Sequence, residues 1–419
     1  MTQTIRTVTS LAVSLALAGC GGGGGGGSNS TPPPSSTPDT TPEIVAPETS
    51  NSGAKGLINV STSLAGTNIV IAVADAGVNT DHQEFATTSL DARSGAFSSE
   101  LLLDGSNNLS YQLQANHSDD HYPDYDASRD FEEAAHGTHV ASLIFGANTG
   151  ILADGTLLAL DVVSSGSVDA GTFDPVGRLP DNLASIMAVT DMAASNKVDF
   201  LNLSMDGAAT YFKPGQDGGL QRDVYAGIEG SGIGVIAAAG NSALDYSEIY
   251  ASNTPQCTDE EMDAASGYAY ERCYALKYSR AETDFVPYQD DTLRDDFIVV
   301  VAVDEAGQIT SFSNRPGASA KIQERFIAAP GVNLDVADHK ADTGYTTASG
   351  TSFAAPLVAA AAGAVKSKFS SLSSAAVLQI LLDTADSTFT GYDPELHGAG
   401  ILDVEAALNV NPNDYISQR

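Results

Sequence analysis

The sequence predicts an α/β fold with a doubly wound, mainly parallel sheet that carries helices on both faces. Short runs of apolar, often β-branched residues recur along the chain, and each is nearly continuous in apolar character, as strands covered on both faces are. Helix-like stretches separate these runs, and such alternation is typical of parallel sheets. Chemically reactive side chains follow some of the runs, and the carboxyl ends of parallel strands meet at one edge in such folds.

The individual elements can be assigned by their composition and spacing. The predicted buried strands are Ile69–Val73, Leu157–Leu160, Phe200–Leu203, Val235–Ala238 and Ile298–Ala302. The predicted helices are 181–196, 219–230 and 353–368. We find no internal repeat, and we expect one large domain over residues 56–410, followed by a C-terminal tail over 411–419.

The N-terminus has the pattern of a targeting segment. Arg6 precedes an apolar run, Leu11–Leu17, which is too short to span a bilayer. The run ends at Leu-Ala-Gly-Cys20, which resembles a bacterial lipobox, so residues 1–19 are expected to be a lipoprotein signal peptide. Acylated Cys20 would then be the membrane anchor, and Gly21 suits sorting to an outer membrane or cell surface. Plain secretion after an ordinary signal peptide is the alternative.

Residues 20–55 are expected to be a flexible tether. Seven glycines from Gly21 to Gly27 precede a stretch rich in Ser, Thr and Pro, with few large apolar residues to bury. No second long apolar segment follows. Contact with a membrane is therefore expected only through the N-terminal lipid.

The charge balance restricts the partners. The chain has 53 acidic and 19 basic residues, a formal net charge of −34. Such a charge repels phosphate backbones, so we expect no nucleic-acid partner. Excess surface acid favours solubility, and the alternatives are a preference for cationic substrates or bound calcium. The acidic segment 119–130 offers oxygen ligands, but Asp-rich loops are usually solvated and no calcium site is assigned.

Three cysteines suggest one with a separate role and one pair. Cys257 and Cys273 lie close together in an acidic segment with the composition of a loop. If they form a disulfide, the compartment is oxidising, and the bond would stabilise the fold by about 3 kcal/mol. Two free thiols are the alternative.

Four residues have the chemistry of an acyl-transfer site. Asp75 follows the first strand, although a single Asp there is usually a turn residue. His136 opens a helix-like run and shares a helix face with His139, one turn later, so one of the two is expected to be structural. Ser352 begins another apolar helix, where free N–H groups suit a developing oxyanion. Asn241 follows the strand that ends at Ala238 and offers a side-chain amide for the same purpose, although Gly-Asn is also a common turn.

Together these residues run Asp, His, Asn, Ser along the chain, the order of subtilisin. The segments Asp75-Ala-Gly-Val, His136-Gly-Thr-His-Val-Ala and Gly350-Thr-Ser-Phe-Ala-Ala-Pro resemble the signatures of the subtilisin-like serine proteases. Four further segments resemble that family: Asn202-Leu-Ser, Ser311-Phe-Ser-Asn, Ala328-Ala-Pro-Gly and Gly398-Ala-Gly-Ile-Leu-Asp. The resemblance extends over nearly all of residues 56–410. The chain is longer than the family minimum over about 243–297, an insert that contains Cys257 and Cys273.

The resemblance implies a serine endopeptidase in which Ser352 is the nucleophile, His136 the base and Asp75 the residue that orients it. It implies that His139 is structural and that Asn241 donates to the oxyanion. It also implies an extended polypeptide substrate and no cofactor. The residues expected to flank the substrate are Ser204, Met205, Asp206, Gly207, Ala239 and Gly240.

Two other functions fit parts of the pattern. A catalytically silent module would keep the fold to bind extended peptides, but such a module is expected to lack a member of the triad. A sedolisin-type peptidase would have Glu in place of His136 and Asp in place of Asn241, which this sequence does not. The intact set therefore favours the serine endopeptidase.

Overall fold

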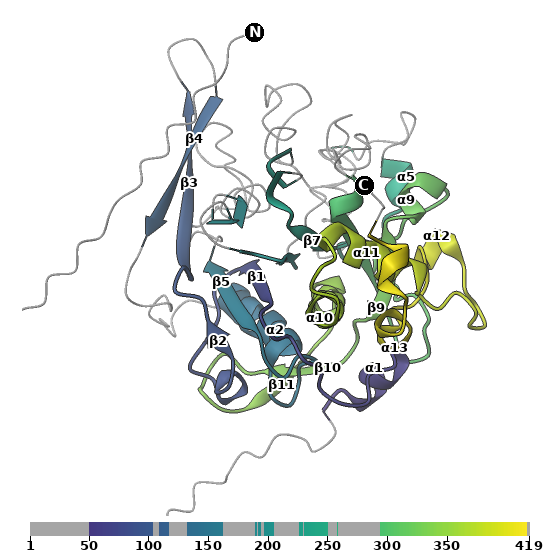
Figure 1. Ribbon diagram of the computed structural model, residues 1–419, viewed down its shortest axis with the longest axis horizontal. Coiled ribbons are helices and arrows are strands. Elements are labelled where there is room, and N and C mark those ends of the chain that lie inside the picture. Colours follow the sequence, from purple (N-terminus) through teal and green to yellow (C-terminus); the bar gives the residue numbers. More distant parts are fainter. Residues whose placement is uncertain are drawn as a thin grey trace, which may run out of the picture. The chain divides into compact units, whose positions relative to one another are not determined.

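The computed structural model describes residues 50–103, 109–116, 132–161, 189–190, 192–193, 197–204, 226–228, 230–249, 258 and 294–416. These residues form a large sheet with helices packed against it and a small separate hairpin (Figure 1). The strands of the large sheet are β1 (Val70–Asp75), β2 (Ser89–Leu90), β3 (Gly95–Leu103), β4 (Leu109–Asn116), β5 (Thr156–Asp161), β6 (Phe200–Leu203), β7 (Gly234–Ala238), β8 (Phe297–Val303) and β9 (Phe326–Pro330). The hairpin consists of β10 (Leu334–Ala337) and β11 (Tyr345–Ala348).

The order of the large sheet is β4-β3-β5-β1-β6-β7-β8-β9, and β2 pairs with β5 outside this path. Every pairing is parallel except the one between β3 and β4. Central strands are buried along their length, as the continuous apolar runs of the sequence predict; all seven residues of β8 are buried. The α/β fold class and the five predicted strands are confirmed.

The described α-helices are α1 (Ser52–Leu57), α2 (Glu132–Phe145), α5 (Tyr246–Ile249), α9 (Ala320–Gln323), α10 (Thr351–Lys368), α11 (Ser374–Asp383), α12 (Pro394–His397) and α13 (Val404–Leu408). Three short 3-10 helices are η1 (Gln83–Phe85), η2 (Arg294–Asp296) and η3 (Pro412–Asp414).

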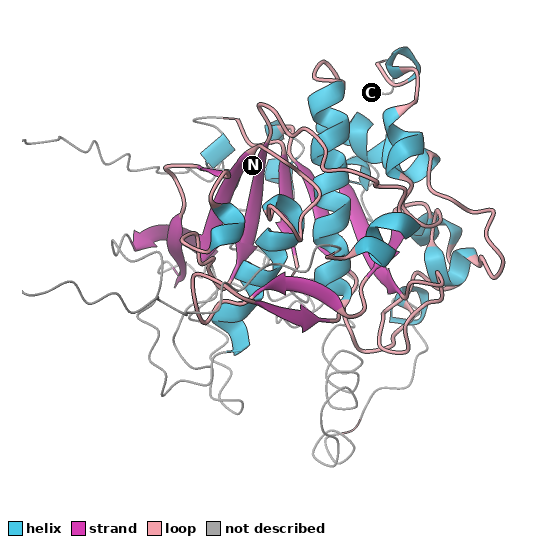
Figure 2. Ribbon diagram, turned by 90° about the horizontal axis from the view of Figure 1, so that it is seen from below, coloured by secondary structure: helices cyan, strands magenta, loops and turns pink. Residues whose placement is uncertain are grey.

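Helix α10 is labelled near the middle of the fold in Figure 1, and Figure 2 shows the helices packed against the sheet. Helix α10 packs across β6, β7, β8 and β9 and against α2, and it is buried from Thr351 to Lys366. Its many alanines allow this close approach, because a small side chain lets a helix lie near a sheet. The predicted helix 353–368 is confirmed with an earlier start. The predicted helices 181–196 and 219–230 lie largely outside the described residues.

The ends of the folded part differ from the predicted boundaries of the domain. The tether was expected to extend to Lys55, but the chain is already packed from Ser50. The Asn51 side chain donates to the Asp335 carbonyl and accepts from the Asp335 N–H. Helix α1 buries Ala54 against the core. At the other end, η3 forms within the expected tail, and Tyr415 packs on the core. Ala54 and Tyr415 are single apolar side chains in otherwise polar stretches of the sequence. Composition alone therefore did not predict that they pack on the core.

Within the described part of the chain, no helix combines the length and the apolar character needed to cross a lipid bilayer.

Candidate active site

Asp75 and His136 meet at the carboxyl end of β1. Asp75 is the last residue of that strand, and His136 lies in the second turn of α2. The His136 Nδ1 atom is 3.0 Å from one Asp75 carboxylate oxygen and 2.9 Å from the other. The Asp75 side chain is 2 % exposed and the His136 side chain 29 %. The arrangement buries the carboxylate and leaves part of the imidazole accessible to solvent.

Two features fix this contact. The Ala76 N–H donates to Asp75 Oδ1 at 2.8 Å, which orients the carboxylate. Gly137 lets α2 approach the strand, because a Cβ at that position would lie 2.1 Å from the Gly77 carbonyl oxygen. Sterics therefore explain why a glycine follows His136 in the sequence.

The Asp75 carboxylate changes the proton affinity of His136. Burial lowers the pKa of His136, but the negative charge of Asp75 and its hydrogen bond together raise this pKa above its ordinary value. The hydrogen bond is best formed by the tautomer with its proton on Nδ1. In that tautomer Nε2 is free to accept a proton.

His139 has a different environment. Its Nε2 atom is buried without a hydrogen-bond partner, and its ring lies 5.7 Å from that of His339 and 6.3 Å from that of Phe353. Burial, reinforced by the nearby histidines, lowers the pKa of His139 to about 4. His139 is therefore neutral and packed at ordinary pH, as a structural histidine would be.

Ser352 lies in the first turn of α10, as predicted, and is 9 % exposed. The next residue, Phe353, has its ring centroid 5.2 Å from that of His136, so the start of α10 lies beside the imidazole. Pro356 has no N–H to donate to the Ser352 carbonyl four residues earlier. The Ser204 hydroxyl donates to that carbonyl instead, at 2.7 Å, and Asn202 donates to Ser204 at 2.8 Å.

Asn241 also contacts the start of α10. Its Oδ1 atom accepts hydrogen bonds from the Thr351 N–H at 2.9 Å and from the Thr351 hydroxyl at 3.1 Å. The Thr351 hydroxyl in turn accepts from the Gly240 N–H at 3.0 Å. The Asn241 oxygen is thus engaged by Thr351, and Nδ2 is the donor group of the side chain.

The structure thus brings together Asp75, His136, Ser352, Asn241, Ser204, Ala239 and Gly240 at the carboxyl edge of β1, β6 and β7 and the start of α10. The other predicted site residues, Met205, Asp206, Gly207, Cys20, Cys257, Cys273 and the acidic segment 119–130, lie outside the described residues. Among the residues that are described, no group of three or more His, Cys, Asp or Glu side chains is placed to hold a metal ion.

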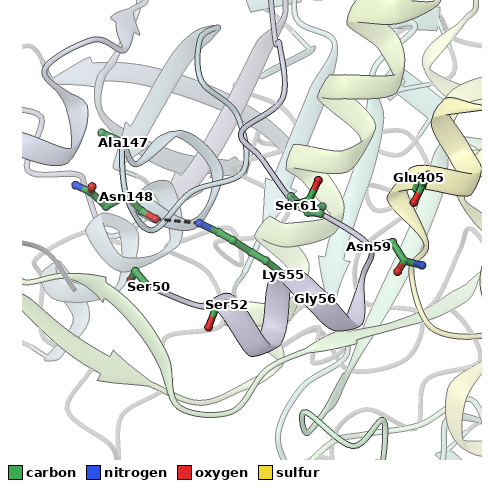
Figure 3. A pocket seen from close by; sticks show the side chains of 10 residues that line it. Ser50, Ser52, Lys55, Gly56, Asn59, Ser61, Ala147, Asn148 and Glu405 are labelled. Atoms are coloured by element: carbon green, nitrogen blue, oxygen red, sulfur yellow. Dashed lines mark hydrogen bonds between the residues drawn. The ribbon is translucent and has the colours of Figure 1, made fainter. Parts of the chain in front are cut away.

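A pocket lined mainly by polar residues lies away from these residues (Figure 3). It is lined by α1 and by the turn after α2, and the Lys55 ammonium donates to the Asn148 carbonyl at 2.9 Å across it. Asn148 follows the end of α2 farthest from His136. None of the predicted site residues lines this pocket.

Sequence reasoning did not assign roles to Asn202, Thr351, Phe353 and Pro356. All four lie within quoted motifs, so their proximity to the site was predictable. Their contacts were not, because they depend on how the start of α10 packs against β6 and α2.

Comparisons with known proteins identify the family of the chain. The sequence model of the subtilase family matches residues 66–400. Subtilisin DY of Bacillus licheniformis is 30 % identical over 279 residues, which cover 65 % of this chain and 77 % of that protein. Mycosin-4 of Mycobacterium tuberculosis is 26 % identical over 286 residues, which cover 66 % of this chain and 57 % of that protein.

Among solved structures, MycP1 from the ESX-1 type VII secretion system is similar with a TM-score of 0.52, a match that covers 86 % of each chain. At 19 % identity this match supports the fold alone. The family match and the identity to subtilisin DY carry the assignment. The chain therefore belongs to the subtilase family and is a serine endopeptidase.

Proposed function

We propose that the chain hydrolyses peptide bonds of extracytoplasmic proteins through Ser352, His136 and Asp75, with an acyl-enzyme intermediate. The observation that carries this proposal is the buried Asp75 carboxylate, which contacts His136 Nδ1 with both oxygens beside the start of α10. As in other subtilases, the catalytic reaction needs no cofactor.

In the first half of the reaction, Ser352 Oγ attacks the scissile carbonyl carbon while His136 Nε2 takes the hydroxyl proton. Asp75 holds the imidazole in the required tautomer and stabilises the imidazolium ion. The C–N bond then breaks, and His136 returns the proton to the leaving amine. In the second half, water attacks the acyl ester by the same route and releases the acid.

The negative charge on the tetrahedral intermediate requires donors that are already in place. Asn241 Nδ2 and the Ser352 N–H supply them in this proposal. Two observations support these roles. The Asn241 oxygen accepts from Thr351, and Ser352 lies in the first turn of α10, where N–H groups lack helical partners. Removing one such donor typically costs about 100-fold to 1,000-fold in kcat.

The substrate is a polypeptide, and we propose that it binds as an extended strand between Ser204–Gly207 and Ala239–Gly240. Ser204 and Ala239 follow adjacent parallel strands, so they lie side by side at one edge of the sheet. We further propose that Asp206 favours basic side chains in the substrate. Asp206→Asn should weaken the preference for Lys or Arg substrates over neutral ones; an unchanged preference would rule out this role.

The N-terminus supports a proposal about location. Residues 1–19 would be removed as a signal peptide, and acylated Cys20 would anchor the enzyme to the outer membrane or cell surface. Cys20→Ala should shift the protein from the membrane fraction to the soluble fraction, and equal membrane recovery of both forms would exclude the lipid anchor. In the same oxidising compartment, Cys257 and Cys273 would form a disulfide, which the mass gain on reduction and alkylation would report.

The activity is tested with Ser352→Ala and a casein or peptide p-nitroanilide substrate. Loss of the nucleophile should abolish turnover without unfolding the protein, because the change removes a single side-chain oxygen atom. Circular dichroism checks that the variant is folded. Turnover that persists in folded Ser352→Ala would exclude Ser352 as the nucleophile, and turnover absent from the unaltered protein as well would favour a silent binding module.

A further inference from the structure

The segment Ala239–Leu244, which we call the Asn241 loop, has an unusual backbone that must be held in place. Gly240 has φ +93° and Ala243 has φ +54°, both in the left-handed region that side chains other than glycine rarely adopt. The loop follows β7 directly and carries Asn241 at its centre. A loop of this kind keeps one shape only if its N–H and C=O groups have fixed partners.

Asn314 supplies those partners from a different part of the chain. Its Oδ1 atom accepts from the Ser242 N–H at 3.1 Å and the Leu244 N–H at 2.8 Å. Its Nδ2 group donates to the Ala239 carbonyl at 2.8 Å, and its backbone N–H donates to the Gly240 carbonyl at 2.9 Å. The loop therefore wraps around one side chain.

Asn314 is itself firmly held. It is 2 % exposed, and its carbonyl accepts a hydrogen bond from the Ser313 hydroxyl at 2.8 Å. That hydroxyl in turn accepts from the Ala302 N–H in β8 at 3.1 Å. The loop is thus tied through Asn314 and Ser313 to the neighbouring strand of the sheet.

We propose that Asn314 is a positioning residue for the oxyanion donor, acting through Asn241. The inference rests on the proposed oxyanion role of Asn241. Thr351 fixes the end of the Asn241 side chain, and Asn314 fixes the backbone on both sides of it. A donor helps a transition state only when it already points at the developing charge, so a loosened loop should slow the chemical step and spare substrate binding.

The test measures kcat and KM on the full chain, with kcat expressed per active site titrated by a fluorophosphonate. Asn314→Ala should lower kcat by about tenfold and leave KM within about twofold. Asn314→Asp keeps the two acceptor bonds but sets a carboxylate oxygen against the Ala239 carbonyl, so it should lower kcat at least as much as Asn314→Ala. This second variant also serves if Asn314→Ala does not fold.

The decisive measurement is the combination with Asn241→Ala. If Asn314 acts through Asn241, adding Asn314→Ala to Asn241→Ala should slow kcat by no more than about twofold, because the donor being positioned is already absent. If Asn314 contributed to stability alone, Asn314→Ala would change kcat by the same factor in the unaltered protein and in the Asn241→Ala protein.

Asn51 provides a matched control. Its side chain also makes three hydrogen bonds to backbone groups, of Thr149 and Asp335, but in the segment before α1. Asn51→Ala should lower stability and leave kcat per active site within about twofold of the unaltered protein. An Asn314→Ala enzyme with unchanged kcat, or with a loss that multiplies that of Asn241→Ala, overturns the inference and leaves the proposed function intact. Full activity of Asn241→Ala itself would remove the oxyanion role on which the inference depends.

Discussion

At the scale of single residues, the proposed mechanism makes the contact between Asp75 and His136 determine the pH at which the enzyme can act. The imidazole is an effective base only while Nε2 is unprotonated. Burial lowers the pKa of His136, and the Asp75 carboxylate raises it by more, so the net shift is upward. A raised pKa means that the active, neutral form is lost at a higher pH as the solution is acidified.

The pH dependence of kcat/KM should therefore have an acid limb above about 6.5, the ordinary pKa of histidine. Asp75→Asn removes the charge that raises this pKa, so the limb should move to lower pH. The rate at its plateau should fall by about 10,000-fold, because the amide favours the wrong tautomer. Initial rates between about pH 5 and pH 10 measure both effects. Asp154→Asn, which alters an exposed carboxylate far from His136, should change neither the pH of the acid limb nor the plateau rate. If the Asp75→Asn enzyme kept its acid limb at the original pH, the account would be contradicted.

Some of these residue-scale features follow from the sequence and others do not. Asp75, His136 and Ser352 each follow or begin a recognisable element, so their meeting at one edge was predictable. The choice between His136 and His139 was not decided by spacing, since both share a helix face. It depends on which ring meets Asp75 and which is buried without a partner. The role of Asn314 depends on the packing of two loops far apart in the sequence.

At the scale of elements, one buried carboxylate joins three segments at the end of α2 farthest from His136. Glu84, in η1, is fully buried and accepts five hydrogen bonds: two each from Asn148 and Thr149 and one from Tyr345 of β11. Lys55 of α1 donates to the Asn148 carbonyl beside it. Burial raises the pKa of Glu84, and these hydrogen bonds lower it by more, to below its ordinary value.

Glu84→Gln should destabilise the protein by about 2 kcal/mol at pH 7, because an amide nitrogen would face N–H donors. The carboxylate stabilises the fold above its unfolded pKa of about 4.3, and this contribution is lost as the pH falls through the lower folded pKa. The difference in the free energy of unfolding between the Glu84→Gln protein and the unaltered protein should therefore become smaller as the pH is lowered. Urea unfolding in the Ser352→Ala background, which prevents self-digestion, measures it.

Glu405, exposed on α13, gives the control: Glu405→Gln should change the free energy of unfolding by less than about 0.5 kcal/mol. Equal stability of the Glu84→Gln and Glu405→Gln proteins would show that the buried cluster is not a stabilising joint. This cluster was not predictable from the sequence, since a glutamate in a polar segment is usually exposed.

At the scale of the whole molecule, the proposed site exists only when three distant parts of the chain are assembled. Asp75 comes from β1, His136 from α2 and Ser352 from α10, and α2 packs against both of the other elements. The parallel order of the sheet was predictable from the apolar runs, and it places the strand ends together. The close approach of α2 to the end of β1 was not, because it depends on Gly137, where a Cβ would lie 2.1 Å from the Gly77 carbonyl oxygen.

The measurement that tests the central claim most directly is labelling of the full folded chain with a fluorophosphonate, read by intact mass and peptide mapping. The proposed site predicts a single adduct on Ser352, absent from the His136→Ala variant and from the urea-unfolded protein. Absence of the adduct from His136→Ala would show that the reactivity of Ser352 depends on its base. Absence from the unfolded protein would show that the reactivity requires the assembled fold. An adduct on another residue, or folded protein that does not react, would contradict the assignment of Ser352, His136 and Asp75 as the catalytic residues.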